Sequence, residues 1–211
     1  MRELDMDLDD LLQRLHAAAG YAPLFRSAFP DVLDPITEEN VARALAAFER
    51  SLITARAPYD QYVAGDEGAL SEEQRAGMNL FASAGCANCH APPLFESSRY
   101  EKRVDSGDLG REAVTKRAED RGKLRVPTLR NLRETGPYFH DGSTVTLEDA
   151  VLREAATSAL AGEGSELDDE QAALVAIFLR KSLMDRTQEP VRPKQVPSGL
   201  QVPKDGFRIP R

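Results

Sequence analysis

The chain has 211 residues, enough for one domain with extensions, and 41% of them are hydrophobic, which suffices for a compact core. It carries 27 Lys and Arg against 35 Asp and Glu, and the resulting net charge of −8 argues against a general nucleic-acid-binding protein. No apolar run approaches membrane-spanning length. No signal peptide is visible either, because Met1 leads directly into an acidic stretch.

The first third of the chain shows two helical patterns. Apolar residues recur at helical spacing over 5–18 and again over 38–54, which predicts two amphipathic helices. Residues 58–70 are expected to form a loop. Between the two helices we expect a hydrophobic core cluster, formed by Tyr21, Leu24, Phe25 and Phe29.

A third predicted helix leads into the most informative stretch of the chain. Ser71 to Gln74 has the form of a capping box, with a hydroxyl at the cap and a glutamine three residues later, and it opens a helix over 72–84. Gly85 is expected to let the chain turn. The next five residues, Cys86-Ala87-Asn88-Cys89-His90, have the Cys-x-x-Cys-His form of a covalent c-type haem site.

Each residue type in this motif has a chemical reason. The two thiols add to the two vinyl groups of the porphyrin, and a spacing of two residues lets one turn present both sulfurs to one edge of the ring. His90 then offers an imidazole nitrogen to the iron. Thioether attachment normally follows export. We therefore expect a periplasmic protein, and a sequence that starts downstream of a leader or of a longer segment.

Two other interpretations of the motif remain open. The cysteines, the only two in the chain, could form a thioredoxin-like redox pair, although such a pair normally follows a strand in a βαβ unit. They could also form a zinc site with His90 and one of the two remaining histidines, since structural zinc takes four ligands.

Residues 95–137 show little regular periodicity, and no strand is expected in them or elsewhere. Ten Lys and Arg lie between 102 and 133. We interpret the segment as a long irregular loop that wraps the haem and offers cations to its propionates, because guanidinium groups suit carboxylates. Arg125 and Arg130, which flank Pro127-Thr128, are the best candidates.

Two more helices are expected near the C-terminus. Thr146 caps one over 147–156, and Asp168, with Gln171 at the box position, caps the last. Five prolines after residue 185 predict an extended tail. The expected fold is mainly α, a cytochrome c-like helical domain around one covalently bound haem. The expected divisions are 1–57 (linking helices), 58–185 (haem domain) and 186–211 (tail).

Three segments of the chain, 28–52, 57–90 and 120–151, carry a family resemblance. Together they resemble the C-terminal haem domain of bacterial di-haem cytochrome c peroxidases and their MauG-type relatives. The resemblance implies a haem that takes and stores an electron, while a second, N-terminal haem meets hydrogen peroxide. It also implies a small cytochrome or cupredoxin as electron donor, and a calcium ion bound partly by the backbone carbonyls of Thr135 and Pro137.

The chain departs from that family in two ways. It has one haem motif, so the peroxidatic haem domain is missing and would have to act in cis or in trans. At the family position of the sixth iron ligand it has Glu154, which is either a distal ligand or a surface glutamate. His140 is the other residue expected near the cofactor, either as a ligand or as a hydrogen-bonding residue that supports its turn.

Three functions follow from these observations. The first is the electron-transfer domain of a di-haem peroxidase that reduces hydrogen peroxide. The second is a stand-alone mono-haem cytochrome that only transfers electrons, suggested by the single motif. The third is a haem with an open iron that reacts with peroxide itself while Glu154 assists proton transfer. A homodimer is also compatible with the sequence.

Overall fold

The structure, a computed structural model, describes residues 7–52, 55–103, 108–160, 162, 164–185, 187 and 195–199. It divides into two compact units: unit 1 contains residues 1–53 and 188–211, and unit 2 contains residues 54–187. The expected proline-rich tail, 186–211, lies almost wholly outside the described residues.

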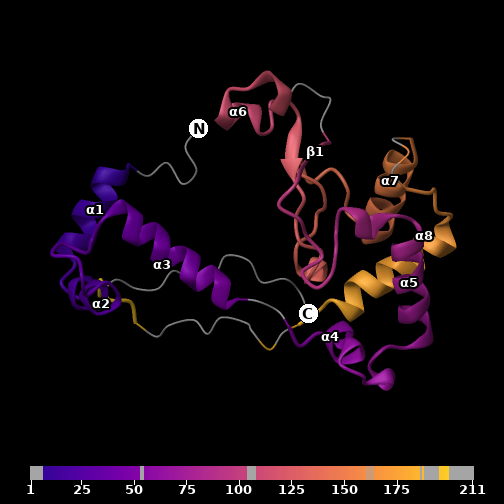
Figure 1. Cartoon of the computed structure of the whole chain (residues 1–211), viewed down its shortest axis with the longest axis horizontal. Helices are drawn as coiled ribbons and strands as arrows, with labels where there is room; N and C mark the ends of the chain where they lie inside the picture. The colour runs from indigo at the N-terminus through magenta and orange to yellow at the C-terminus, as the bar shows by residue number, and fades with distance from the viewer. Residues whose placement is uncertain are drawn as a thin grey trace. The chain divides into compact units, whose positions relative to one another are not determined.

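The described part of unit 1 contains three helices, α1 (Leu8–Ala17), α2 (Tyr21–Ala28) and α3 (Glu38–Ser51) (Figure 1). Side chains cap two of them, because Asp7 accepts hydrogen bonds from the first turn of α1 and Thr37 accepts one from Asn40 N. The helices predicted over 5–18 and 38–54 are therefore confirmed, each a few residues shorter than expected.

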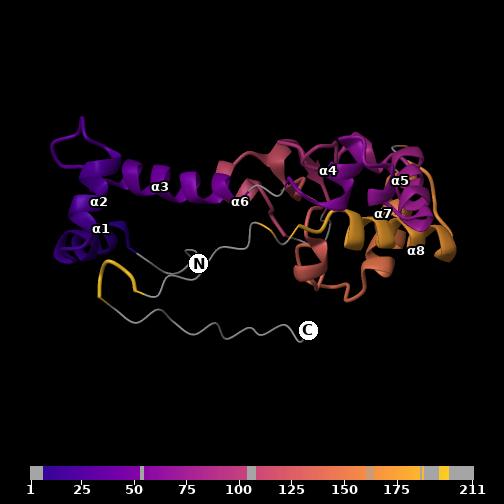
Figure 2. The same cartoon turned by 90° about the horizontal axis from the view of Figure 1, so that it is seen from below.

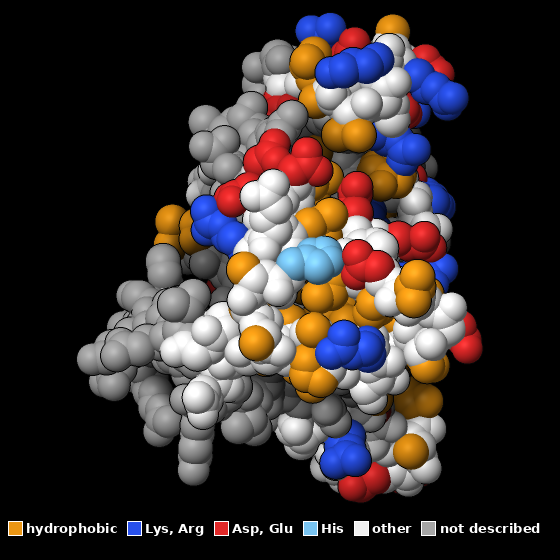
Figure 3. Space-filling view, turned by 90° about the vertical axis from the view of Figure 1, so that its left-hand side faces the viewer, with side chains coloured by type: hydrophobic (Ala, Val, Ile, Leu, Met, Phe, Trp, Pro, Cys, Tyr) orange, Lys and Arg blue, Asp and Glu red, His pale blue; other side chains and the backbone are white. Residues whose placement is uncertain are grey.

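The predicted core cluster of unit 1 is wrong. Its residues lie on or next to α2, where no side chain is buried, and Leu24 is 54% exposed. Leu45 and Phe48 on α3 are exposed as well. Figure 3 shows the α1–α2 side of the molecule, where hydrophobic side chains lie exposed among charged ones. The amphipathic pattern identified the apolar face correctly but did not reveal that it lies open.

Unit 2 is built on α4 (Pro58–Val63), α5 (Glu72–Ser83), α7 (Leu147–Leu160) and α8 (Asp169–Ile177), and a π-helical turn (Phe178–Ser182) extends α8. Figures 1 and 2 show α5, α7 and α8 side by side. The loop expected over 58–70 is wrong: proline starts α4, and a 3₁₀ turn, Glu67–Ala69, follows. Both predicted capping boxes, at α5 and α8, are confirmed.

The core of unit 2 joins α5 and α8. These helices cross so closely that a Cβ added at Gly77 would lie 2.0 Å from the carbonyl oxygen of Leu174. Phe81, Phe95 and Phe178 pack together with ring centroids 5.7–6.1 Å apart in tilted or T-shaped arrangements. Phe95 comes from the expected loop, so this segment contributes to the interior.

The expectation of no strands is also wrong. Strands β1 (Tyr100–Lys102) and β2 (Lys123–Arg125) pair antiparallel, with Tyr100 opposite Arg125. Short helical turns, Glu112–Thr115 (α6), Ala118–Asp120 and Leu132–Glu134, occupy more of the segment. Both strands have three residues and are largely charged, so neither shows the alternation that reveals a strand. The prediction of a mainly helical chain is confirmed.

Among the residues that the structure describes, none of the helices is both long enough and apolar enough to cross a membrane.

Candidate functional site

The Cys-x-x-Cys-His motif lies directly after α5, and the chain turns into it at Gly85. The backbone of Gly85 has φ 86°, a left-handed conformation that suits glycine and makes the turn that the sequence predicted. Hydrogen bonds from Asn88 N to Gly85 O and from His90 N to Cys86 O close a single turn over the motif. Both cysteines and His90 are thereby carried by one short, hydrogen-bonded segment.

The side chain of His90 is oriented by two backbone carbonyls. Its Nδ1 lies 3.2 Å from Phe95 O and 3.0 Å from Pro127 O. Carbonyl oxygens only accept, so Nδ1 carries the proton and donates to both. Nε2 then keeps its lone pair, which is the tautomer a metal-binding histidine requires.

The ionisation of His90 agrees with this tautomer. Burial, the main cause, lowers the pKa of His90 below its ordinary value of 6.5, and the positive charge of Arg103 lowers it further, while the two carbonyls oppose the shift. At neutral pH the imidazole is therefore neutral and its lone pair is available.

The cysteines are free thiols and differ from a redox-active pair. They form no disulfide, and burial, with a smaller contribution from the Glu154 charge, raises the pKa of the Cys86 thiol to about 11. Redox-active Cys-x-x-Cys motifs instead lower the pKa of a cysteine to make it a nucleophile. The helix before the motif also argues against a thioredoxin-like unit.

The zinc interpretation lacks a fourth ligand. His16 Nε2 lies 3.2 Å from Asp34 in unit 1, and His140 Nε2 lies 3.0 Å from Asp108. Within the described residues, no group of three or more His, Cys, Asp or Glu side chains is placed to share a metal ion.

Two arginines that the sequence analysis did not single out lie at the motif. Arg99 Nη2 lies 3.7 Å from Cys89 Sγ, and the same guanidinium donates to Asn88 O and to Glu101. Arg103 lowers the pKa of His90 through its charge. Arg99 directly precedes β1 and Arg103 directly follows it. Had this strand been recognised in the sequence, both arginines could have been identified as residues at its two ends.

Glu154 on α7 also lies within electrostatic reach of the motif, since its charge contributes to the raised pKa of Cys86. One of its carboxylate oxygens lies 3.3 Å from Arg103 Nη2. The residue at the expected sixth-ligand position is thus paired with the cation that acts on His90.

Arg125 and His140 line one hollow of about 430 Å³, together with Tyr100, Asp108, Gly110, Arg111, Val114, Thr115, Lys123 and Leu124. The Arg125 side chain is 57% exposed, and its Nη2 lies 3.5 Å from a carboxylate oxygen of Glu96. His140 hydrogen-bonds to Asp108 and is half exposed. The structure therefore brings these two predicted residues together, at the surface.

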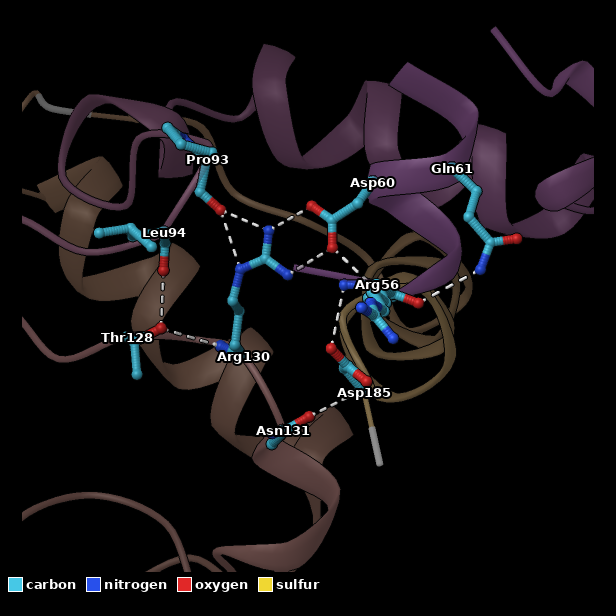
Figure 4. Close-up of polar contacts among 10 residues, drawn as sticks. Arg56, Asp60, Gln61, Pro93, Leu94, Thr128, Arg130, Asn131 and Asp185 are labelled. Carbon is cyan, nitrogen blue, oxygen red and sulfur yellow. Dashed lines mark hydrogen bonds and ion pairs between the residues drawn. The ribbon is translucent and has the colours of Figure 1, made fainter. Parts of the chain in front are cut away.

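Arg130 has a different environment from Arg125 (Figure 4). Its side chain is only 5% exposed and makes a two-pronged ion pair with Asp60 of α4, with Nη1 and Nη2 at 2.9 and 2.6 Å. Nε and Nη2 also donate to Pro93 O. These four hydrogen bonds engage most of the N–H groups of the guanidinium inside the protein.

Thr135 and Pro137, the predicted calcium ligands, lie in a turn after the 3₁₀ segment Leu132–Glu134. The Thr135 hydroxyl donates to Leu132 O, and the Gly136–Pro137 peptide bond is cis. Both residues are exposed. This hydrogen bond of the Thr135 hydroxyl is thus local to its own turn and connects Thr135 to no residue of the Cys86–His90 motif.

The residues of the motif fit a c-type haem. Two free thiols lie in one turn with a neutral imidazole whose Nδ1 is engaged, and the guanidinium of Arg99 lies beside Cys89, where a cation would suit an anionic group of the cofactor. His90 would ligate the iron, and Cys86 and Cys89 would hold the porphyrin edge.

Comparison with known proteins gives consistent matches. A family model described as di-haem cytochrome c peroxidase matches residues 1–68. The methylamine utilization protein MauG of Methylorubrum extorquens is 42% identical over 155 residues, which cover 71% of this chain and 43% of that protein. The cytochrome c551 peroxidase of Pseudomonas aeruginosa is 38% identical over 149 residues, which cover 66% of this chain and 43% of that protein.

A solved structure agrees with these matches. The crystal structure of a MauG-like protein associated with microbial copper homeostasis superposes with a TM-score of 0.65 at 27% identity, covering 87% of this chain and 64% of that one. The chain spans less than half the length of both curated relatives described above. On these matches, the chain belongs to the family of MauG-type di-haem cytochrome c peroxidases.

Proposed function

We propose that this chain is the c-type haem electron-transfer domain of a di-haem cytochrome c peroxidase-like oxidoreductase. The observation that carries the proposal is the state of His90: Nδ1 donates to two carbonyls, and a neutral Nε2 remains one turn from two free thiols. The family of the chain supports an oxidoreductase of the peroxidase type. The substrate of the whole protein would be hydrogen peroxide, reduced to water.

When bound, a c-type haem supplies reversible one-electron chemistry at its iron. The residues of the chain would position it: Cys86 and Cys89 would hold the porphyrin, and His90 would ligate the iron. Arg99, Arg103 and exposed Arg125 would be the cations available to the propionates. His140 lies in the same hollow as Arg125. The Arg103–Glu154 pair lies within reach of the motif, and Glu154 would either ligate the metal or stay paired.

Several partners belong to this proposal. A small cytochrome or cupredoxin would deliver electrons, and a peroxidatic haem domain would act in cis or in trans; a homodimer is compatible with this arrangement. The location would be the periplasm, where thioether attachment takes place. The carbonyls of Thr135 and Pro137 are candidate calcium ligands, because calcium prefers oxygen donors.

The attachment itself is tested by mass. The chain is produced in a host that attaches c-type haem, and its intact mass is measured under denaturing conditions. Wild type should retain one haem. The Cys86→Ala, Cys89→Ala double variant should lose it, whereas the control His140→Ala should keep it, because His140 makes no thioether. A wild-type chain without covalent haem would contradict the proposal.

A stand-alone mono-haem cytochrome is the second candidate, favoured by the single pair of cysteines in the 211 residues. The two functions differ in their response to peroxide. Reduced haem-loaded chain is mixed with peroxide, with and without a peroxidatic haem domain from a relative. Oxidation that requires the added domain supports the first function, and no oxidation in either mixture supports the second.

Peroxide oxidation by the chain alone would indicate the third possibility, an iron that reacts directly. Glu154→Gln separates the roles of that carboxylate. A changed electron paramagnetic resonance spectrum of the ferric protein indicates that Glu154 contacts the iron, and an unchanged spectrum indicates that it stays with Arg103.

A further inference from the structure

The two carbonyls that orient His90 belong to segments far apart in the chain. Phe95 O lies in the segment 93–95, and Pro127 O lies in the segment 127–130. Because one imidazole N–H donates to both oxygens, its direction depends on how the two segments are held against each other. The bonds between these segments therefore decide the geometry at His90.

Three side-chain or backbone groups tie the segments together. The Thr128 hydroxyl donates to Leu94 O at 2.6 Å (Figure 4). Leu129 N donates to Phe95 O at 3.1 Å. Arg130 donates twice to Pro93 O, from Nε at 2.9 Å and from Nη2 at 2.6 Å. The donors all come from residues 128–130, and the acceptors are the carbonyls of 93–95.

Arg130 is in turn fixed by Asp60. The carboxylate accepts hydrogen bonds from both terminal nitrogens of the guanidinium, Nη1 and Nη2. Its Oδ2 also accepts from Ala57 N at 2.9 Å, at the start of α4. The guanidinium carbon lies 5.6 Å from the centre of the Phe95 ring. Arg130 is thus held from one side by α4 and from another by the ring of the residue whose carbonyl faces His90.

The burial of this pair suggests a role other than stability. Both side chains are largely removed from solvent, 5% exposed for Arg130 and 18% for Asp60. A buried ion pair gains little net stability over a well-packed apolar pair, because desolvation offsets the attraction. What the planar guanidinium of Arg130 does provide is a fixed geometry between its hydrogen-bond partners, Asp60 and Pro93 O, which a flexible lysine would not provide.

We propose that Arg130 and Asp60 are positioning residues for the iron ligand: the pair fixes Pro93–Phe95 against Pro127–Arg130, and so holds both carbonyls on His90 Nδ1. This inference rests on the proposed function, since it concerns a haem-bound His90. A firmly hydrogen-bonded Nδ1–H makes the imidazole a more basic ligand, which favours ferric iron. Loosening the two carbonyls should therefore raise the midpoint potential.

The test uses the full haem-loaded chain in four variants. Arg130→Gln and Asp60→Asn remove the pair, Arg130→Lys keeps the charge without the planar guanidinium, and Arg180→Gln is the matched control. Arg180 also makes an ion pair within unit 2, with Glu148, and that pair involves neither segment. The midpoint potential is measured by spectroelectrochemistry, and the ferric spectrum by electron paramagnetic resonance.

We expect Arg130→Gln and Asp60→Asn to shift the potential upward and to broaden the ferric spectrum, Arg130→Lys to shift it less, and Arg180→Gln to match wild type. Equal potentials in wild type and both pair variants, all with covalent haem, would overturn the inference while leaving the proposed function intact. A wild type without covalent haem is instead the failure of the proposed function.

Thr128→Val keeps the inference testable if the Arg130 variants do not fold. It removes the 2.6 Å bond to Leu94 O and the 3.2 Å bond that Arg130 N donates to the hydroxyl, and Thr128 is exposed, so little packing is lost. A smaller upward shift of the potential in this variant supports the inference, and an unchanged potential and spectrum overturn it.

Discussion

The unit that carries Cys86–His90 buries a connected core, whereas the N-terminal unit buries one large hydrophobic side chain, Ile36, among its described residues. In unit 2, Phe81 on α5 and Phe178 directly after α8 are almost fully buried. In unit 1, Leu45 and Phe48 on α3 are 60% and 55% exposed. Similar apolar patterns in the sequence thus lead to opposite degrees of burial.

This difference shows what an amphipathic pattern means. The pattern predicts which face of a helix is apolar, but a second surface must cover that face before it contributes to stability. The haem motif follows α5 in the unit where this cover exists, which gives the ligand a fixed support. The helices of unit 1 present their apolar face without such cover among the described residues of that unit.

The largest predicted effect tests this contrast directly. Phe178→Ala should lower the free energy of unfolding by about 3–5 kcal/mol, because it removes a fully buried ring and leaves a cavity. Phe48→Ala should change it by less than about 0.5 kcal/mol, because the ring is largely exposed. Urea unfolding of the haem-loaded chain measures both.

A large loss in Phe48→Ala would contradict the comparison, since it would mean that the apolar face of α3 is covered in solution. Hydrogen exchange of peptides from each unit then locates the loss. If protection from exchange were lost only in residues 38–51, the surface that covers the apolar face of α3 would belong to unit 1.

A second prediction concerns the closeness of packing in unit 2. Gly77→Ala should lower the free energy of unfolding by about 1–3 kcal/mol, since the added methyl group meets the Leu174 carbonyl and α5 must move from α8. Gly68→Ala is the control, because its Cβ would meet only Asp66 Oδ1 at 3.4 Å. Equal urea midpoints for the two variants would show that the crossing can relax.

Features that depend on neighbouring residues were predictable from the sequence. Ser71 with Gln74 and Asp168 with Gln171 form the expected capping boxes, because each pair is three residues apart and needs no other partner. The turn expected at Gly85 is present for the same reason, with a left-handed backbone at the glycine. These signals indicate where α5 begins and ends, and so where the motif starts.

Features that depend on distant partners were not predictable. Arg125 and Arg130 look alike beside Pro127-Thr128, yet one is 57% exposed and the other is 5% exposed. The difference comes from Asp60, 70 residues away in the chain. The pairing of β1 with β2 could not be predicted for the same reason. A three-residue strand is too short to show a pattern of its own, and it forms only because the partner strand supplies hydrogen bonds.

The smallest predicted effects are opposite responses of the two units to pH. The pKa of His16 in unit 1 is raised, first by the Leu12 carbonyl and then by Asp34, so its contribution is present below about pH 6.5 and is lost as pH rises through the folded pKa. Burial would raise the pKa of Asp185 in unit 2, but hydrogen bonds from Thr187 and from backbone N–H groups outweigh it and lower the pKa. Its contribution is present above about pH 3.9 and is lost as pH falls through the folded value.

Hydrogen exchange of peptides from each unit, measured across pH and corrected for intrinsic rates, separates the two responses. His16→Gln should remove the loss of protection that unit 1 shows as pH rises above about 6.5, and it should leave unit 2 unchanged. Asp185→Asn should remove part of the acid-side loss in unit 2, because the carboxylate that accepts from Arg56 N at 2.9 Å and Thr187 N at 2.8 Å no longer titrates. If His16→Gln changed the protection of unit 2 as strongly as that of unit 1, the two units would unfold together. The difference in their buried cores would then not correspond to separate stabilities.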